Sequence, residues 1–167
     1  ARGGAASGTF AVIGYLSTGS MSVDGAGSRW TGSTDLTLGY LSGGHGTLSV
    51  SNGATFNNAF AFIGYAAGST GAVTIDGAGT VWTNSGTFNV GESGTGTVTL
   101  SNNATANALA VHIAHQSGST GTLNIGAAAG SAPVGAGVLN TQAILFGAGN
   151  GTINFNQGNG PSGVLIN

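Results

Sequence analysis

Apolar and polar residues alternate in a short segment that recurs along the chain. Gly46–Val50 reads Gly-Thr-Leu-Ser-Val, so that Leu48 and Val50 are separated by a polar residue. Similar segments begin at Gly19, Gly71, Gly96, Gly121 and Gly151. A period of two is typical of a β-strand that buries one face, so each copy predicts such a strand.

A second strand pattern lies between these copies and ends in a small residue followed by Tyr, Glu or His. Its five copies are Ala11–Tyr15, Leu36–Tyr40, Ala61–Tyr65, Phe88–Glu92 and Val111–His115. Three successive steps of the first pattern, from Gly46 to Gly121, are 25 residues long. Alternate copies resemble each other more than neighbours do, because Asp24–Trp30 matches Asp76–Trp82. The full unit is therefore about 50 residues, made of two similar 25-residue turns.

A turn of two or three short strands is too small to bury its own apolar face and must stack on its neighbours. The repeats therefore predict an all-β fold, a right-handed parallel β-helix (solenoid) with about 25 residues per turn. We expect a single domain with regular repeats over residues 1–126 and less regular turns over residues 127–167. Gly121 and Gly151 are 30 residues apart, so the Ala-rich residues 127–140 predict a loop or distorted turn.

The composition excludes several classes of protein. Lys plus Arg is 2, which makes a nucleic-acid partner very improbable because a phosphate backbone requires basic residues. Cys is 0, which excludes disulfides and thiolate metal sites. Charged residues are only 4 % of the chain. A stack of coils favours such a composition, because like charges in register repel each other whereas rows of Thr, Ser and Asn can hydrogen-bond. No apolar stretch is long enough to span a membrane as a helix.

Several motifs resemble the passenger-associated repeat of type V secretion (autotransporter) proteins. One turn carries Asp-Gly-Ala-Gly-Ser-Arg-Trp at Asp24–Trp30, then Leu38-Gly39-Tyr40 and Gly46–Ala54. The next carries Val81-Trp82, Val90-Gly91-Glu92 and Gly96–Ala104. The resemblance covers about residues 10–126. Residues 143–156 are similar to the stretch ahead of the membrane-proximal cap, although the family's Phe-Asn-His is here Phe155-Asn156-Gln157.

The resemblance implies a passenger segment of a Gram-negative autotransporter. Such a segment crosses the periplasm and outer membrane to the cell surface or is secreted, and the parent chain carries a C-terminal outer-membrane β-barrel. Position 1 is not Met, and we expect the 167 residues to be a fragment of a longer passenger. On this interpretation the segment is a non-catalytic adhesin, host-interaction or virulence factor. Its partners would be a host cell-surface protein, matrix, glycan or a second copy.

Few titratable groups suggest chemistry, and we expect no catalytic, cofactor-binding or metal-binding residues. Asp24 and Asp76 should lie about 10 Å apart, two strand spacings, which is near the upper range for an inverting glycosidase pair. Both sit in a Gly-rich corner, where the expected role of Asp is to cap its own turn. His112 and His115 are three apart, which on a straight strand places them on opposite faces and prevents joint chelation.

The best candidate for a recognition surface is the set Tyr15, Tyr40 and Tyr65. Because they are separated by 25-residue steps, they should stack as a ladder along one edge of the rod. The ladder has two interpretations, aromatic stacking that fixes the register or a strip that faces a sugar or receptor. Trp30 and Trp82 share one corner two turns apart, where we expect them to pack against the rod.

Four functions from different classes remain. Surface display and adhesion fits the composition best, and self-association between rods is compatible with it. A polysaccharide-acting enzyme is disfavoured because no cluster of carboxylates is present. An ice-binding protein is chemically reasonable, since a flat Thr/Ser/Asn array on an uncharged β-helix suits it, although Ser20, Ala72 and Asn124 interrupt the rows.

Overall fold

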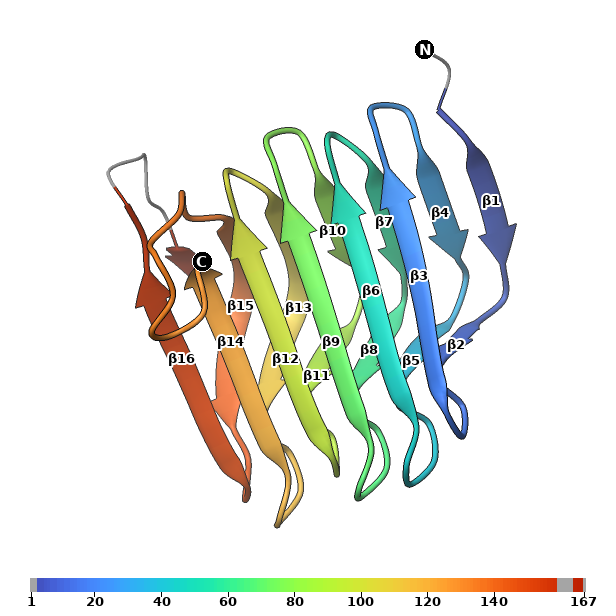
Figure 1. The fold of residues 1–167 in the computed structure, drawn as a ribbon, viewed down its shortest axis with the longest axis vertical. Coiled ribbons are helices and arrows are strands. Elements are labelled where there is room, and N and C mark those ends of the chain that lie inside the picture. Colours follow the sequence, from blue (N-terminus) through green and yellow to red (C-terminus); the bar gives the residue numbers. More distant parts are fainter. Residues whose placement is uncertain (1–2, 159–163, 167) are drawn as a thin grey trace.

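The computed structural model describes residues 3–158 and 164–166 of the chain. These residues form β-strands joined by turns, and they contain no helix. The strands pair in parallel in stacked coils, and Thr70 pairs with Thr95, one 25-residue step on. In Figure 1 the front strands run up, the back strands run down and the coil advances leftward, which is a right-handed winding. The predicted parallel β-helix is confirmed.

One wall of the coil is a six-stranded parallel sheet of seven-residue strands, which forms the front of Figure 1. Its register places the leading Gly of each repeat in a single column. In spatial order the strands are β3 (Thr18–Asp24), β6 (His45–Ser51), β9 (Thr70–Asp76), β12 (Thr95–Ser101), β14 (Thr120–Gly126) and β16 (Asn150–Asn156). We call this the long sheet.

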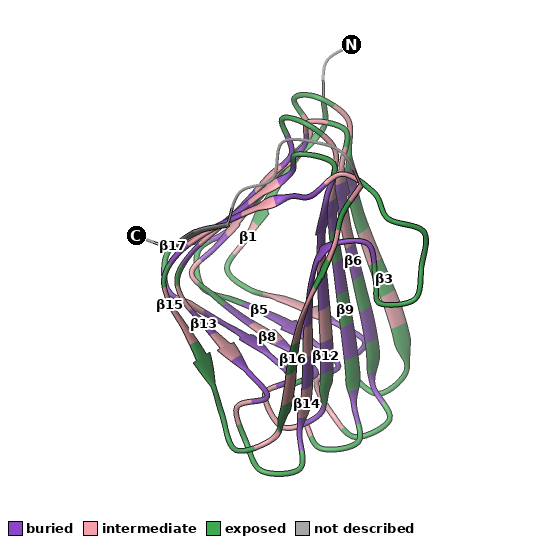
Figure 2. Ribbon diagram, turned by 90° about the vertical axis from the view of Figure 1, so that its left-hand side faces the viewer, coloured by how far each residue is buried: buried purple, intermediate pink, exposed green. Residues whose placement is uncertain are grey.

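The other strands belong to one bent sheet that supplies two further walls, as Figure 2 shows. The first wall contains β1 (Ala5–Gly8), β4 (Arg29–Gly32), β7 (Thr55–Asn58) and β10 (Val81–Asn84). The second contains β2 (Ala11–Ile13), β5 (Asp35–Leu38), β8 (Phe60–Ile63) and β11 (Thr87–Val90). Two longer strands run through both walls, β13 (Thr105–Ile113) and β15 (Val138–Phe146), and β17 (Val164–Ile166) pairs with β15.

The core consists of columns in which each inward side chain lies on its counterpart in the next coil. Leu48, Val50 and Ile75 of the long sheet are fully buried, as alternation predicts. Opposite them, the Trp30 ring stacks on Phe56 at 6.2 Å, and the Phe56 ring meets Trp82 edge-on at 6.3 Å. The expected packing of both tryptophans against the rod is confirmed, and Trp82 is 0 % exposed.

The second strand pattern ends earlier than its sequence suggests. Ile63 is the last residue of β8, and Gly64 follows with φ 67°. A Cβ on Gly64 would overlap the carbonyl oxygen of Thr95 in the next coil, so the position needs both the left-handed backbone and the missing side chain. Tyr65 therefore lies in the turn beyond the strand, and the chain changes direction just before it.

The Gly-rich corners are joined between coils through Asp side chains. Asp24 accepts hydrogen bonds from Ser51 Oγ at 2.6 Å and Asn52 Nδ2 at 2.7 Å. Asp76 repeats the arrangement with Ser101 and Asn102, at 2.5 and 2.7 Å. The expectation that these carboxylates cap their own turns was wrong. Because the strands stack in register, each Asp lies beside a Ser of the following coil, and its carboxylate accepts hydrogen bonds from that coil.

Residues 127–137 form the longest connection between described strands, and isolated bridges tie it to Ser101 and Gln157. Residues 159–163 and 167, which belong to the predicted less regular C-terminal turns, lie outside the described residues, as do residues 1 and 2. A search of the described residues for a helix long and apolar enough to cross a membrane found none.

Candidate functional site

Tyr15, Tyr40 and Tyr65 form a continuous stack along one edge of the coil. The ring centroids of Tyr15 and Tyr40 are 5.1 Å apart with an interplanar angle of 11°, and those of Tyr40 and Tyr65 are 5.4 Å apart at 12°. The predicted ladder is therefore present. Its two ends are exposed, Tyr15 at 54 % and Tyr65 at 39 %. Both faces of the Tyr40 ring are covered by its neighbours, so this ring offers a ligand its edge rather than a face.

The bend after each strand brings residues three apart to the same side of the chain. The Phe62 and Tyr65 rings meet edge-on with centroids 5.6 Å apart. His112 and His115 likewise lie together, with ring centroids 5.1 Å apart. The prediction that these histidines face opposite sides was wrong, because Ala114 between them has φ 54° and ends the straight strand geometry on which that prediction relied.

Aromatic residues of the second wall extend the Tyr stack into a wider surface. Phe60 pairs with Asp35 of the preceding coil, and Phe10 stands one coil earlier because the next residue, Ala11, pairs with Leu36. Phe10 is 65 % exposed and Phe60 is 43 % exposed. We call the following set the aromatic face: Phe10, Phe60, Phe62, Tyr15, Tyr40, Tyr65, Asp35 and Thr37.

A shallow pocket of about 270 Å³ opens on the aromatic face. Phe10, Val12, Tyr15 and Tyr40 contribute apolar surface to it, and Asp35 contributes a carboxylate. Apolar walls with a single polar group that can fix an orientation are usual in small-ligand sites. The pocket is thus the part of the aromatic face where apolar surface and a carboxylate could together select a ligand.

The Tyr column continues as Glu92 and His115, whose side chains lie within hydrogen-bond distance, with 2.9 Å between His115 Nδ1 and Glu92 Oε1. Burial lowers the pKa of His112, and the adjacent His115 lowers it further, against the attraction of Glu92. No group of three His, Cys, Asp or Glu side chains within residues 3–158 is arranged to hold a metal ion. The change from Tyr to Glu and His in this column marks the end of the aromatic face.

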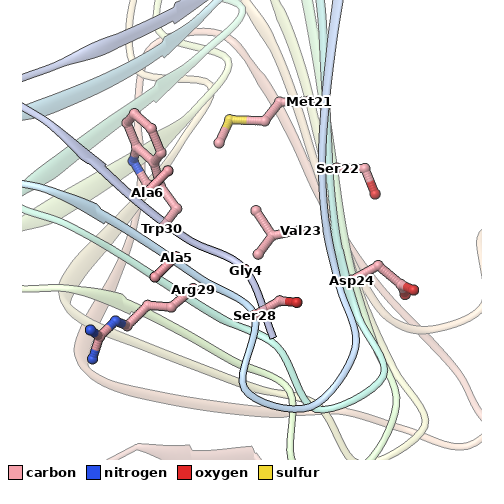
Figure 3. Close-up of a pocket in the computed structure, with 10 residues that line it drawn as sticks. All are labelled: Gly4, Ala5, Ala6, Met21, Ser22, Val23, Asp24, Ser28, Arg29 and Trp30. Carbon is pink, nitrogen blue, oxygen red and sulfur yellow. The ribbon is translucent and has the colours of Figure 1, made fainter. Parts of the chain in front are cut away.

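A larger cavity of about 470 Å³ lies at the N-terminal end of the coil. Figure 3 shows Met21 and Val23 pointing toward Trp30 inside it, while the side chains of Asp24 and Arg29 point away. Its interior is therefore lined by apolar side chains that pack against the hydrophobic core. With no charged group directed inward, it lacks the polar contacts that orient a ligand.

The carboxylates considered for catalysis are engaged in the architecture. Asp24 and Asp76 each accept two side-chain hydrogen bonds from the following coil, with Ser51 between their strands. These hydrogen bonds hold the pKa of Asp24 below its usual 3.8. A general acid needs a raised pKa, so this environment suits a structural carboxylate rather than a glycosidase acid.

No protein-family model, curated protein sequence or solved structure matches this chain. The sequence motifs therefore stand as a resemblance, and the geometry of the faces has to support any functional proposal.

The sequence alone identified the three tyrosines but not their surroundings. Phe10, Asp35 and Phe60 are also separated by 25-residue steps, a signal that a search of every column would have found. The sequence does not predict the role of Phe62 for a different reason, because its contact with Tyr65 depends on the bend at Gly64.

Proposed function

We propose that the protein is a non-catalytic β-helical segment of an autotransporter passenger that binds a host surface through its aromatic face. The single observation that carries this proposal is the aromatic face itself, in which four large aromatic side chains are exposed, namely Phe10, Tyr15, Phe60 and Tyr65. Exposed apolar patches of this kind mark binding sites in proteins. Surface display, secretion across the outer membrane and an adhesive role rest on the resemblance of the repeats.

A glycan is the ligand class that the pocket favours. Sugars present apolar C–H patches together with hydroxyl groups, and Phe10 and Tyr15 offer aromatic surface beside the acceptor oxygens of Asp35. One face of the Tyr15 ring is stacked on Tyr40, and the side chain is 54 % exposed. Recognition would therefore use the end of the Tyr ladder and the pocket rather than the sandwiched ring in the middle.

The test is binding to immobilised glycans and matrix glycoproteins. We expect the wild-type chain to bind at least one of them, and the combined Tyr15→Ser, Tyr40→Ser and Tyr65→Ser variant to lose binding with unchanged circular dichroism. Asp35→Asn should weaken binding without touching the stack. Val134→Ser is the matched control, because Val134 is an exposed apolar residue, at 37 %, outside the aromatic face. If the triple variant binds as well as the wild type, the Tyr ladder has a structural role only.

A second candidate function is a self-associating surface scaffold. It is favoured by two exposed aromatic residues of the inward columns, Phe146 at 58 % and Phe155 at 62 %. Phe155 pairs with Ile125 of the core and would be buried by one more coil. Light scattering after size-exclusion chromatography over a range of concentrations separates the two candidates, since a monomer at all concentrations is incompatible with the scaffold.

A further inference from the structure

The outward side of the long sheet carries side chains at the four alternate positions of its strands, and three of these four columns consist mainly of Thr, Ser and Asn. The fourth column follows the corner at the end of the strands and contains Asp24 and Asp76. The members of the first three columns are Thr18, His45, Thr70, Thr95, Thr120 and Asn150; Ser20, Thr47, Ala72, Thr97, Thr122 and Thr152; and Ser22, Ser49, Thr74, Thr99, Asn124 and Asn154. We call this surface the hydroxyl face, and Figure 2 shows its strands aligned as one continuous wall.

The middle column keeps its hydroxyl groups available to solvent. Among the described residues, side-chain hydrogen bonds on the neighbouring column join Asn124 to Thr99 at 3.1 Å and Asn154 to Asn124 at 2.9 Å. None involves Thr97 or Thr122. The hydrogen bonding that a polar row can form is therefore found in the column of Asn124 and not at Thr97 or Thr122, since a Thr side chain is shorter than an Asn.

The spacing of these hydroxyls is close to that of water molecules in ice. Successive coils place equivalent side chains about 4.8 Å apart, and alternate residues of a strand are about 6.6 Å apart. In ice, with O···O hydrogen bonds of about 2.75 Å, the tetrahedral angle separates two waters bonded to a common third by about 4.5 Å. The repeat across the layers of that lattice is about 7.3 Å. The spacing of about 6.6 Å along the strand is shorter than this repeat, and a change of Thr rotamer can move the hydroxyl oxygen by the difference between the two.

From this spacing we propose that the hydroxyl face binds ice. Each Thr offers a hydroxyl that can join the water lattice and a methyl group that orders water beside it. The three columns contain no Asp, Glu, Lys or Arg, which matters because a hydrated ion would disturb the lattice, and the carboxylates of Asp24 and Asp76 lie at the corner edge of the sheet, outside these columns. This site is separate from the aromatic face, so its success or failure is independent of the glycan-binding proposal.

The experiment measures thermal hysteresis and inhibition of ice recrystallisation by the full chain. We expect the wild type to be active and Thr97→Lys or Thr122→Lys to lose activity, because each places a flexible charge in the middle of the face. Thr83→Lys is the matched control, since Thr83 points outward from β10 on a different wall and should leave activity unchanged. Ala72→Thr should raise activity by joining Thr47 to Thr97 in an unbroken column.

Two outcomes would overturn the inference. A wild-type chain that neither separates the freezing and melting points nor slows recrystallisation would remove it. So would a Thr97→Lys variant as active as the wild type. If a lysine variant fails to fold by circular dichroism, the gain expected from Ala72→Thr decides instead, because Ala72 is exposed and tolerates the added atoms. No gain in that variant would count against the inference.

Discussion

Asn84 shows what an in-register stack requires of a single buried side chain. Its counterpart in the preceding coil, Asn58, is fully engaged, because Nδ2 donates to Phe60 O and Asn84 Oδ1 while Oδ1 accepts from Trp82 Nε1. Asn84 is 3 % exposed, and its own Nδ2 has no partner. The next residue in this column is Ala108, since Asn107 pairs with Thr83. The row of amides thus ends on a free donor.

An acceptor at position 108 should stabilise the protein. In the Ala108→Asn variant the new Oδ1 would lie where Asn84 Oδ1 lies relative to Asn58, and would accept from Asn84 Nδ2. Satisfying a buried donor contributes about 1 kcal/mol, so the midpoint of urea unfolding should rise. Ala106→Asn is the control, because Ala106 is 0 % exposed in an apolar column and the same substitution there should destabilise. A lower midpoint for Ala108→Asn would contradict the expectation.

The Asp-mediated contacts between corners explain why the repeat is 50 rather than 25 residues long. Asp24 in one coil receives Ser51 and Asn52 from the next, and the pattern begins again at Asp76. A carboxylate only accepts hydrogen bonds, so two successive coils of Asp would repel, whereas Asp alternating with Ser-Asn supplies acceptor and donor in turn. The alternation of Asp with Ser-Asn at this corner therefore groups the 25-residue coils into pairs, which gives the 50-residue repeat.

The Asp24 contact should make stability depend on pH. Hydrogen bonds from Ser51 and Asn52 lower the pKa of Asp24 from 3.8 in the folded state. The unfolded chain therefore binds this proton more readily, so the stabilisation is complete above the unfolded pKa and is lost as the pH falls through the lowered one. Asp24→Asn should unfold at lower urea concentration than the wild type at neutral pH, with a difference that shrinks as the solution is acidified.

Asp35→Asn is the control for this measurement, because Asp35 is an exposed carboxylate on β5 that lies away from the corners. We expect its unfolding midpoint to follow the wild type across the same pH range. If Asp24→Asn and the wild type keep a constant difference down to acid pH, the stabilisation does not come from the ionised carboxylate.

Period and alternation were enough to predict the fold, because a coil that buries one face has few other ways to pack. The same reasoning found the Tyr stack, which depends only on equal steps along the chain. It failed where the backbone leaves the strand conformation. Ala114 adopts a positive φ that sequence rules assign to Gly, and this residue brings His112 beside His115. The Asp contacts were missed because they depend on which coil a side chain reaches, which a local turn motif does not specify.

At the scale of the whole molecule, the faces of the coil differ in the kind of uncharged side chain that they present rather than in their charge. The long sheet presents hydroxyls and amides outward, while the N-terminal part of the second wall presents Phe10, Phe60 and the Tyr stack. A coil stacked in register repeats each outward residue type along a column, so a small change in the repeat specifies an entire face. This property allows two surfaces of different chemistry to share one rod.

The ends of such a rod should be its least stable parts. A central coil contacts neighbours on both sides, whereas among the described strands β3 pairs only with β6, and Met21 and Trp30 beside it are partly exposed. Because repeat stability is close to a sum of contacts between neighbours, opening an end coil breaks one interface and opening a central coil breaks two. Hydrogen exchange followed by mass spectrometry should therefore find the slowest backbone amides in β9 and β12, with faster exchange in β3 and β16. Equal protection in all six strands would mean that the rod opens only as a single cooperative unit, and the neighbour-by-neighbour account of its stability would have to be abandoned.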